Sequence, residues 1–128
     1  MTIFYHGTES VFDQFKNGPT YFTDNPSIAG VYSVRGSVHA DKSFPHIRPC
    51  YLDLGTVHEL CEVQMIELFG EPSVRDWTSF EDYAYYMQEQ GYNSIYLKGV
   101  FDYAGEHGLV AYDQWVVFER KQIKSIFE

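Results

Sequence analysis

The chain has 128 residues, 45% hydrophobic and 18% aromatic, so it can bury one core in one domain and is too apolar to be disordered. Its formal net charge of −9, with no cluster of Lys or Arg, argues against nucleic acid as a partner; the acidic surface serves solubility or meets a basic protein. No basic leader, apolar span or CxxC spacing is present, so we expect a cytoplasmic protein with reduced thiols and no membrane contact.

The first third of the chain predicts two strands and a short helix. Residues 2–7 alternate between two faces, as a strand does, and place His6 near the strand's end. The turn signal at residues 17–19 precedes a second strand over residues 20–23, which are aromatic or β-branched. An Asp-Asn-Pro start then predicts a helix over residues 24–32.

The middle of the chain predicts a third strand and a helix. The strand covers residues 47–54, and Pro49 indicates a sheet edge or an irregular start. Thr56 and Glu59 have the spacing of a capping box, which predicts a helix running from there toward Phe69.

The last part of the chain predicts a long helix followed by strands. The helix begins with the capping-box pair Thr78 and Glu81, ends at Gly91, and carries an apolar stripe made of Phe80, Tyr83, Ala84 and Met87. Further strands are expected over residues 92–97, 109–118 and 123–127, with residues 98–108 as a connection. The order of elements predicts an α+β fold in a single domain spanning residues 1–128.

Common catalytic and metal-binding patterns are absent. The histidines and cysteines of the middle third match no zinc spacing, so we expect no metal; they are His39, His46, His58, Cys50 and Cys61. The chain also lacks a GxSxG elbow and the glycine patterns of Walker and Rossmann loops. A nucleotide would have to be bound in another way.

Three ordered blocks resemble a known family. Tyr5-His6-Gly7-Thr8, then residues 18–24, and then Ser27, Ala29 and Tyr32, resemble the opening of ADP-ribosyltransferases of the diphtheria-toxin and poly(ADP-ribose) polymerase class. The end of the chain, at residues 91–92, 113–118 and 122–126, is similar to the compact transferase domains of phage and mobile-element polyvalent proteins. The resemblance implies an ADP-ribosyltransferase-like fold, with a split antiparallel sheet and a few flanking helices, and NAD as substrate.

The resemblance also implies roles for the first two blocks in NAD binding. His6 would bond a hydroxyl of the adenosine ribose, and the backbone of Gly7 would meet the nicotinamide carboxamide, with Thr8 beside it. Tyr21 and Tyr32 would enclose the nicotinamide ring, whose flat cationic face favours aromatic contact.

Other site residues are less regular. Ser27 is a candidate for the carboxamide, although the position of the polymerases' serine falls on Ala29. Where most active members carry a glutamate that counters the forming positive charge, this chain has Gln114, which can orient a ligand but not neutralise charge. Asp113 should face the other side of the strand, so it cannot simply substitute without a bulge. We expect His6, Tyr21 and Gln114 to form the signature triad of the site. Because Gln114 is uncharged, extension of ADP-ribose into a polymer is disfavoured.

Two carboxylates precede that strand. Asp102 and Glu106 lie where the family keeps an acceptor-orienting loop, and either one could act as general base or supply the missing charge, or be a solvated loop residue. We therefore expect an NAD-dependent mono-ADP-ribosyltransferase with a macromolecular acceptor, most simply protein, acting as a phage or mobile-element effector. The alternative is a catalytically silent NAD pocket or acidic protein-binding module that inhibits a host or defence protein.

Overall fold

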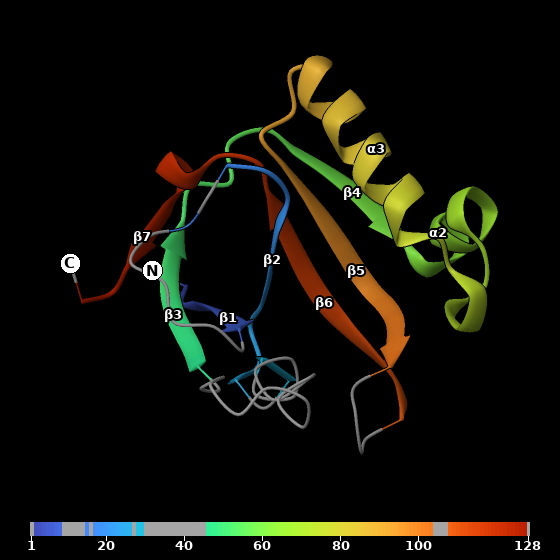
Figure 1. The fold of residues 1–128 in the computed structure, drawn as a ribbon, viewed down its shortest axis with the longest axis horizontal. Coiled ribbons are helices and arrows are strands. Elements are labelled where there is room, and N and C mark those ends of the chain that lie inside the picture. Colours follow the sequence, from blue (N-terminus) through green and yellow to red (C-terminus); the bar gives the residue numbers. More distant parts are fainter. Residues whose placement is uncertain are drawn as a thin grey trace, which may run out of the picture.

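The structure is a computed structural model that describes residues 2–8, 15, 17–26, 28–29, 46–103 and 108–127. Seven strands in this part of the chain form one sheet in the order β4-β5-β6-β2-β1-β3-β7 (Figure 1). They are β1 Phe4–Thr8, β2 Thr20–Thr23, β3 His46–Leu52, β4 Val57–Cys61, β5 Ser94–Tyr103, β6 Leu109–Val117 and β7 Ile123–Ser125. Helices α2 (Glu62–Phe69) and α3 (Trp77–Glu89) lie at the β4–β5 end, with 3-10 turns η2 (Pro72–Val74) and η4 (Arg120–Gln122). All pairings are antiparallel except β4 with β5, so the predicted α+β class is confirmed.

The sheet is split between β1 and β2. These two strands share one registered pair, Tyr5 with Thr23, whereas β1 and β3 share five pairs and β2 and β6 share four. In Figure 1, β1, β3 and β7 accordingly form one group, and β2, β6, β5 and β4 form another. At the split, the Nδ1 atom of His6 bonds the carbonyl oxygen of Tyr21 at 2.8 Å. A side chain thus takes the place of the ladder bond that a continuous sheet would make there.

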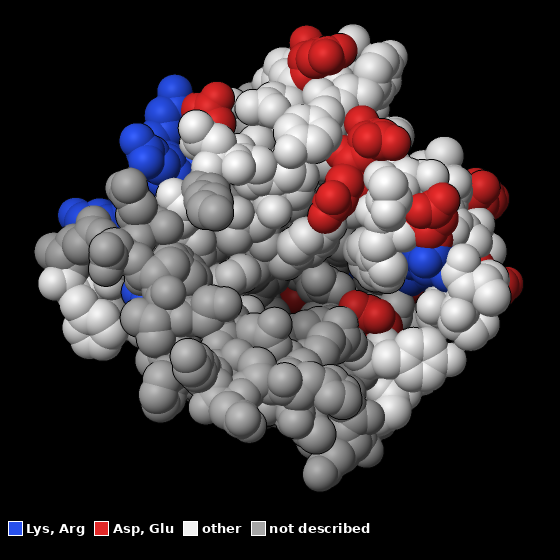
Figure 2. Space-filling model, viewed as in Figure 1, with Lys and Arg blue, Asp and Glu red and all other residues white. Residues whose placement is uncertain are grey.

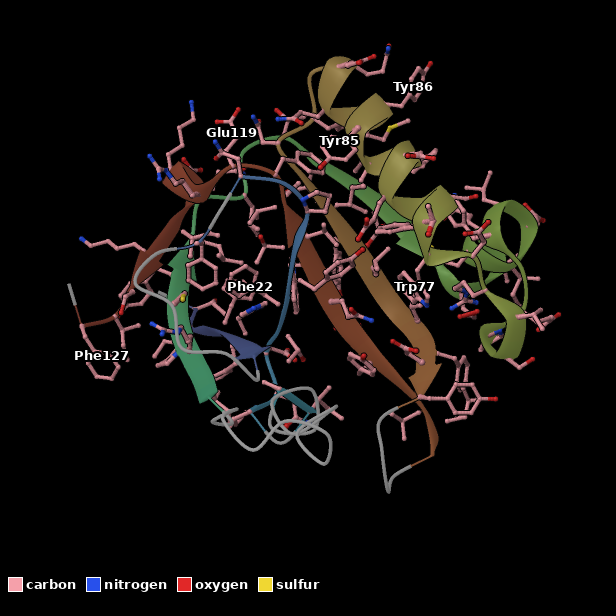
Figure 3. All side chains as sticks on the ribbon, viewed as in Figure 1. Phe22, Trp77, Tyr85, Tyr86, Glu119 and Phe127 are labelled. Atoms are coloured by element: carbon pink, nitrogen blue, oxygen red, sulfur yellow. The ribbon has the colours of Figure 1, made fainter. Side chains whose placement is uncertain are left out.

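The two faces of the sheet bury two separate clusters. On the face covered by α2 and α3, called the helix face below, Phe80 and Met65 pack against Val116 and Phe118 of the β6 end. On the opposite face, the far face, the buried cluster consists of Phe4, Phe22, Cys50 and Val117. Because side chains alternate along a strand, Val116 and Val117 enter different clusters. Figure 3 shows Phe22 and Trp77 on the corresponding two sides.

The expected apolar stripe of α3 is confirmed, and its start lies slightly earlier than predicted. Phe80 and Ala84 are fully buried, while Tyr83 and Met87 pack against the same cluster. The cap is Asp76, whose side chain accepts a bond of 3.0 Å from the backbone N–H of Ser79. Asp is a preferred N-cap because it satisfies one of the unbonded N–H groups of the first turn.

The helix predicted from Thr56 is wrong over its first turn. Residues 57–61 form β4, which pairs in parallel with β5, and α2 begins only at Glu62. The N-cap is Cys61, whose backbone N–H donates to the Gln64 side chain at 2.9 Å. The capping-box spacing between Thr56 and Glu59 was overridden by a pairing with a strand far along the chain.

Strand β5 is longer than predicted because a bulge carries it through a glycine. The register slips between Leu97 and Val100, and Gly99 adopts a positive φ of 59°, a conformation that favours glycine. The strand then continues to Tyr103, into the segment expected to be a connection. Of the helix predicted over residues 24–32, Pro26, Ile28 and Ala29 are helical, Asp24 and Asn25 precede the helix, and residues 27 and 30–32 lie outside the described residues.

A buried ion pair completes the edge of β5 beyond the end of β4. The β4 ladder stops at the pair Cys61–Lys98. Further along, the backbone N–H of Phe101 donates to Glu62 at 2.9 Å, and Arg75 donates to the Phe101 carbonyl at 2.9 Å. Arg75 also pairs with Glu62 itself, and its side chain is 1% exposed. These three residues, called the edge clip below, satisfy backbone groups that an edge strand would otherwise leave unbonded.

No helix in the described ranges has the length and apolar character needed to cross a membrane.

Candidate active site

The sheet order places the three family-like blocks side by side. Strand β2 lies between β1 and β6, so the block containing His6 and the block containing Gln114 flank the block containing Tyr21. Across these strands, Gln114 pairs with Thr23, and Thr23 pairs with Tyr5. Segments that are far apart in the sequence therefore meet at the centre of the sheet.

Tyr21 lies on the helix face, next to the first turns of α3. Its ring centroid is 6.2 Å from that of Trp77, edge-on, and 6.1 Å from that of Phe80. Its hydroxyl donates to Glu81 at 3.4 Å. Burial, followed by the charge and hydrogen bond of Glu81, raises the pKa of Tyr21 above its usual value, so the phenol stays protonated.

Gln114 is a buried side chain whose amide nitrogen has no partner among the described residues. The residue is 5% exposed, and its Nε2 atom makes no hydrogen bond within the described part of the chain. It shares the helix face with Val116, which pairs with Tyr21. A buried donor left unbonded costs about 1–3 kcal/mol. A ligand with acceptor oxygens, as a ribose has, would satisfy it, so the residues present fit a nucleotide substrate.

Asp113 is held on the far face, as the alternation along the strand predicted. Its carboxylate accepts bonds from the Tyr96 hydroxyl at 3.0 Å and from the Gly99 backbone N–H at 2.8 Å. Tyr96 in turn stacks on Trp115, with centroids 4.9 Å apart and planes at 10°. Burial and the bond to Asp113 raise the pKa of Tyr96 to about 12. Asp113 therefore stabilises the β5 bulge and does not reach the side of Gln114.

Asp102 is a carboxylate on the Gln114 side of the sheet. It pairs with Val110 across the β5–β6 hairpin, which places it on the helix face. Its carboxylate accepts bonds from the Tyr112 hydroxyl at 3.4 Å and the Tyr103 N–H at 2.8 Å. Tyr112 precedes Gln114 by two residues, a step of about 6.6 Å. The charge of Asp102 is also one of the causes that raise the pKa of Tyr21.

The His6 ring lies on the far face of the sheet. It contacts Tyr21, whose side chain lies on the helix face, through a hydrogen bond to the Tyr21 backbone carbonyl. Its centroid is 5.4 Å from Phe22 and 5.3 Å from Phe15. Because a carbonyl only accepts, the bond to Tyr21 requires the proton on Nδ1, which makes Nε2 an acceptor. Burial, with a smaller effect of Arg48, lowers the pKa of His6, so the ring is neutral at pH 7.

Gly7 and Thr8 lie just beyond the single β1–β2 pair. They pair with Ile47 and His46 on the β3 side, and no described residue of β2 pairs with them. Their β2-facing backbone edge therefore lies at the split. The remaining predicted site residues lie outside the described residues: Ser27, Tyr32 and Glu106.

Two residues of α3 beside Tyr21 were missed at the level of sequence. Trp77 and Glu81 contact Tyr21 and are four residues apart, so they form a second stripe next to the core stripe of the same helix. The signal that could have identified them is the same helical periodicity, read on the neighbouring face of α3.

Comparison with known protein families decides the class. A family model described as "ADP-Ribosyltransferase in polyvalent proteins" matches residues 1–128. The chain belongs to this ADP-ribosyltransferase family. Neither the curated proteins nor the solved structures give a match. The resemblance seen in the sequence is confirmed over the whole chain, and in this ADP-ribosyltransferase the strands that hold His6, Tyr21 and Gln114 are the three central strands of the sheet.

Proposed function

We propose that this protein is a mono-ADP-ribosyltransferase that uses NAD as substrate and a protein as acceptor, as a cytoplasmic effector of a phage or mobile element. The observation that carries the proposal is the buried amide nitrogen of Gln114, which has no hydrogen-bond partner among the described residues and lies two residue pairs along the β2–β6 ladder from Tyr21. A fold that leaves a buried donor unsatisfied accepts a loss of stability, which a ligand at that position would recover.

The nicotinamide end is assigned to Tyr21. Cleavage of the nicotinamide–ribose bond leaves positive charge on the sugar, so the site must hold the leaving ring and counter that charge. The Tyr21 ring offers a face to the flat cationic ring, and Trp77 and Glu81 fix its orientation. Gln114 would bond a ribose hydroxyl, and Asp102 would supply the carboxylate that Gln114 lacks, as counter-charge or as base toward the acceptor.

The adenosine end is assigned to β1. The acceptor atom Nε2 of a neutral His6 suits a ribose hydroxyl, and Gly7 has no side chain to obstruct a ligand at the split. Because Gln114 carries no charge, we limit the proposed reaction to the transfer of one ADP-ribose to each acceptor site.

The first experiment is a calorimetric titration with NAD. We expect the parent protein to bind NAD and the Tyr21→Ala variant to lose about tenfold in affinity, because aromatic and cation–π contacts contribute about 0.5–2 kcal/mol. Tyr86→Ala is the matched control: it removes a tyrosine of α3 that is 53% exposed, and its affinity should stay within about twofold. No binding of NAD to the parent would refute the proposal.

The second experiment measures transfer of labelled ADP-ribose from NAD to proteins of a cell lysate. We expect labelled acceptors with the parent and none with His6→Ala or Gln114→Ala. Binding of NAD with no labelled protein would instead favour the silent pocket, in which the domain acts as an inhibitor. Free ADP-ribose without labelled protein would identify a hydrolase.

A further inference from the structure

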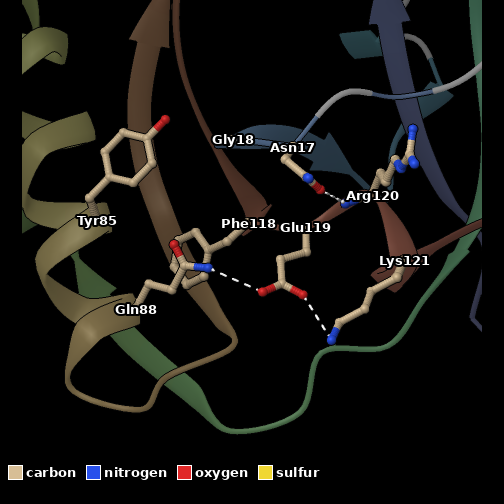
Figure 4. A pocket seen from close by; sticks show the side chains of 8 residues that line it. All are labelled: Asn17, Gly18, Tyr85, Gln88, Phe118, Glu119, Arg120 and Lys121. Carbon is tan, nitrogen blue, oxygen red and sulfur yellow. Dashed lines mark hydrogen bonds and ion pairs between the residues drawn. The ribbon is translucent and has the colours of Figure 1, made fainter.

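A pocket of about 540 Å³ lies beside the candidate active site, at the other end of α3 (Figure 4). Its walls are Tyr85 and Gln88 of α3 on one side, and Asn17 and Gly18, before β2, on the other. Phe118, which follows β6, and the η4 turn close it. Its volume is within the range of about 300–1,000 Å³ that is usual for ligand sites.

The pocket wall and the site are built on the same two elements, α3 and the strand β6 with its following residue. On β6, Phe118, Val116 and Gln114 share one face, in steps of about 6.6 Å. On α3, Glu81 and Tyr85 are one turn apart, so the helix that holds Tyr21 also forms the pocket wall. The two walls are close, because a Cβ on Gly18 would lie 3.3 Å from the Tyr85 hydroxyl. Gly18 and Tyr21 are three residues apart, which is about 10 Å along an extended chain.

The pocket lining includes a cation, Arg120, that no carboxylate of the described residues pairs with. Lys121 pairs with Glu119 at 3.1 Å, and Gln88 donates to the same carboxylate at 3.5 Å. Arg120 is held by its backbone N–H, which donates to Asn17 at 2.9 Å, and no carboxylate of the described residues forms an ion pair with its guanidinium. Figure 2 shows basic groups at the η4 edge of a protein whose net charge is −9, while acidic groups dominate over α2 and α3.

We propose that this pocket docks an acidic segment of the acceptor protein, an inference that rests on the proposed transferase function. Arg binds carboxylates through two parallel hydrogen bonds, and Tyr85 and Phe118 provide aromatic walls for neighbouring side chains. The pocket wall at Gly18 lies three residues from Tyr21, about 10 Å along an extended chain. The pocket thus selects acceptors with an acidic residue near the modified side chain.

The test uses two fluorescein-labelled decapeptides that differ only in their central residues, Glu-Glu-Tyr against Gln-Gln-Tyr. By fluorescence polarisation without NAD, we expect the acidic peptide to bind at least about tenfold more tightly than the neutral one. Arg120→Glu and the milder Arg120→Gln should each remove this preference. Lys124→Glu is the matched control, because it makes the same charge change as Arg120→Glu on an exposed residue of β7 outside the pocket, and it should change binding less than about twofold.

Backbone amide chemical shifts locate the peptide. We expect peptide-induced shifts at Asn17, Gly18 and Arg120. With NAD present, we expect the Arg120→Gln variant to have a higher KM for acidic acceptors than the parent protein, at unchanged kcat. Equal binding of the two peptides, equal losses in the Arg120 and Lys124 variants, or displacement by a single-stranded oligonucleotide would overturn it. NAD binding is measured separately, so intact NAD turnover without peptide preference refutes the docking site alone. Peptide preference without NAD binding refutes the transferase alone.

Discussion

Replacing Gln114 with methionine separates stability from function. Methionine has nearly the shape of glutamine but no amide, so Gln114→Met removes a buried donor that has no partner in the described structure. Relief of its desolvation should stabilise the fold by about 1–3 kcal/mol. For a domain of this size, each kcal/mol corresponds to about 3–6 °C in Tm. The same variant should lose NAD turnover, because the donor that would bond the ribose hydroxyl is gone.

The chain contains a matched control in Gln122, a second buried glutamine. Its side chain makes four hydrogen bonds: it accepts from the backbone of Phe118 and Glu119 and donates to the carbonyls of Asp53 and Asn93. At about 1 kcal/mol for each bond, Gln122→Met should lose about 4 kcal/mol. The two substitutions are chemically identical and should move stability in opposite directions.

The assay is urea unfolding followed by fluorescence, with thermal unfolding as a second probe. If Gln114→Met loses more than about 1 kcal/mol, the amide of Gln114 is satisfied within the fold, and the reasoning that makes it a ligand contact fails. If the variant is stabilised but keeps full NAD turnover, Gln114 does not act on the substrate.

Three further outcomes are expected. In the edge clip, Glu62→Gln leaves the buried Arg75 guanidinium without its counter-charge and should cost about 3–5 kcal/mol in urea unfolding, while the exposed Glu59→Gln should stay within about 0.5 kcal/mol. Because the pKa of His6 is lowered from 6.5 in the folded state, the unfolded chain binds more protons as the pH falls. The free energy of unfolding should therefore decrease as the pH drops from neutral through 6.5. A His6→Gln variant titrated in parallel should show a shallower decrease. Asp102→Asn should lower the transfer rate at least about tenfold at unchanged NAD affinity, and equal rates would exclude Asp102 as the missing carboxylate.

Local patterns predicted the elements whose structure depends on local chemistry. The strand over residues 20–23 and the apolar stripe of α3 follow from alternation and helical periodicity, and both are confirmed. The same alternation correctly separated Asp113 from Gln114, which made the latter the residue to examine. Pro49 indicates a sheet edge or an irregular start of the strand, and the registered pairs of β3 with β7 indeed begin only at Cys50.

Features that depend on distant partners could not be predicted in this way. Residues 57–61 become a strand because β5 pairs with them. Within that segment alone, the capping-box spacing of Thr56 and Glu59 is the stronger signal, and it predicts a helix. Similarly, the bulge at Gly99 is stabilised by Asp113, a residue of the next strand. In the site, the family-like blocks identified Tyr21 but not its neighbour Glu81, because only packing of α3 against β2 brings the two together. The face on which the His6 ring lies likewise depends on the split between β1 and β2.

The order of strands in the sheet has a consequence for synthesis on the ribosome. Strand β2 is among the first elements to be made, yet its neighbour β6 is among the last. Until β6 emerges, one edge of β2 has no strand to pair with, and such long-range pairing folds slowly. The residues around Gln114 and Tyr21 therefore come together only when most of the domain has been translated. Any activity of this site therefore has to wait until folding of the domain is nearly complete.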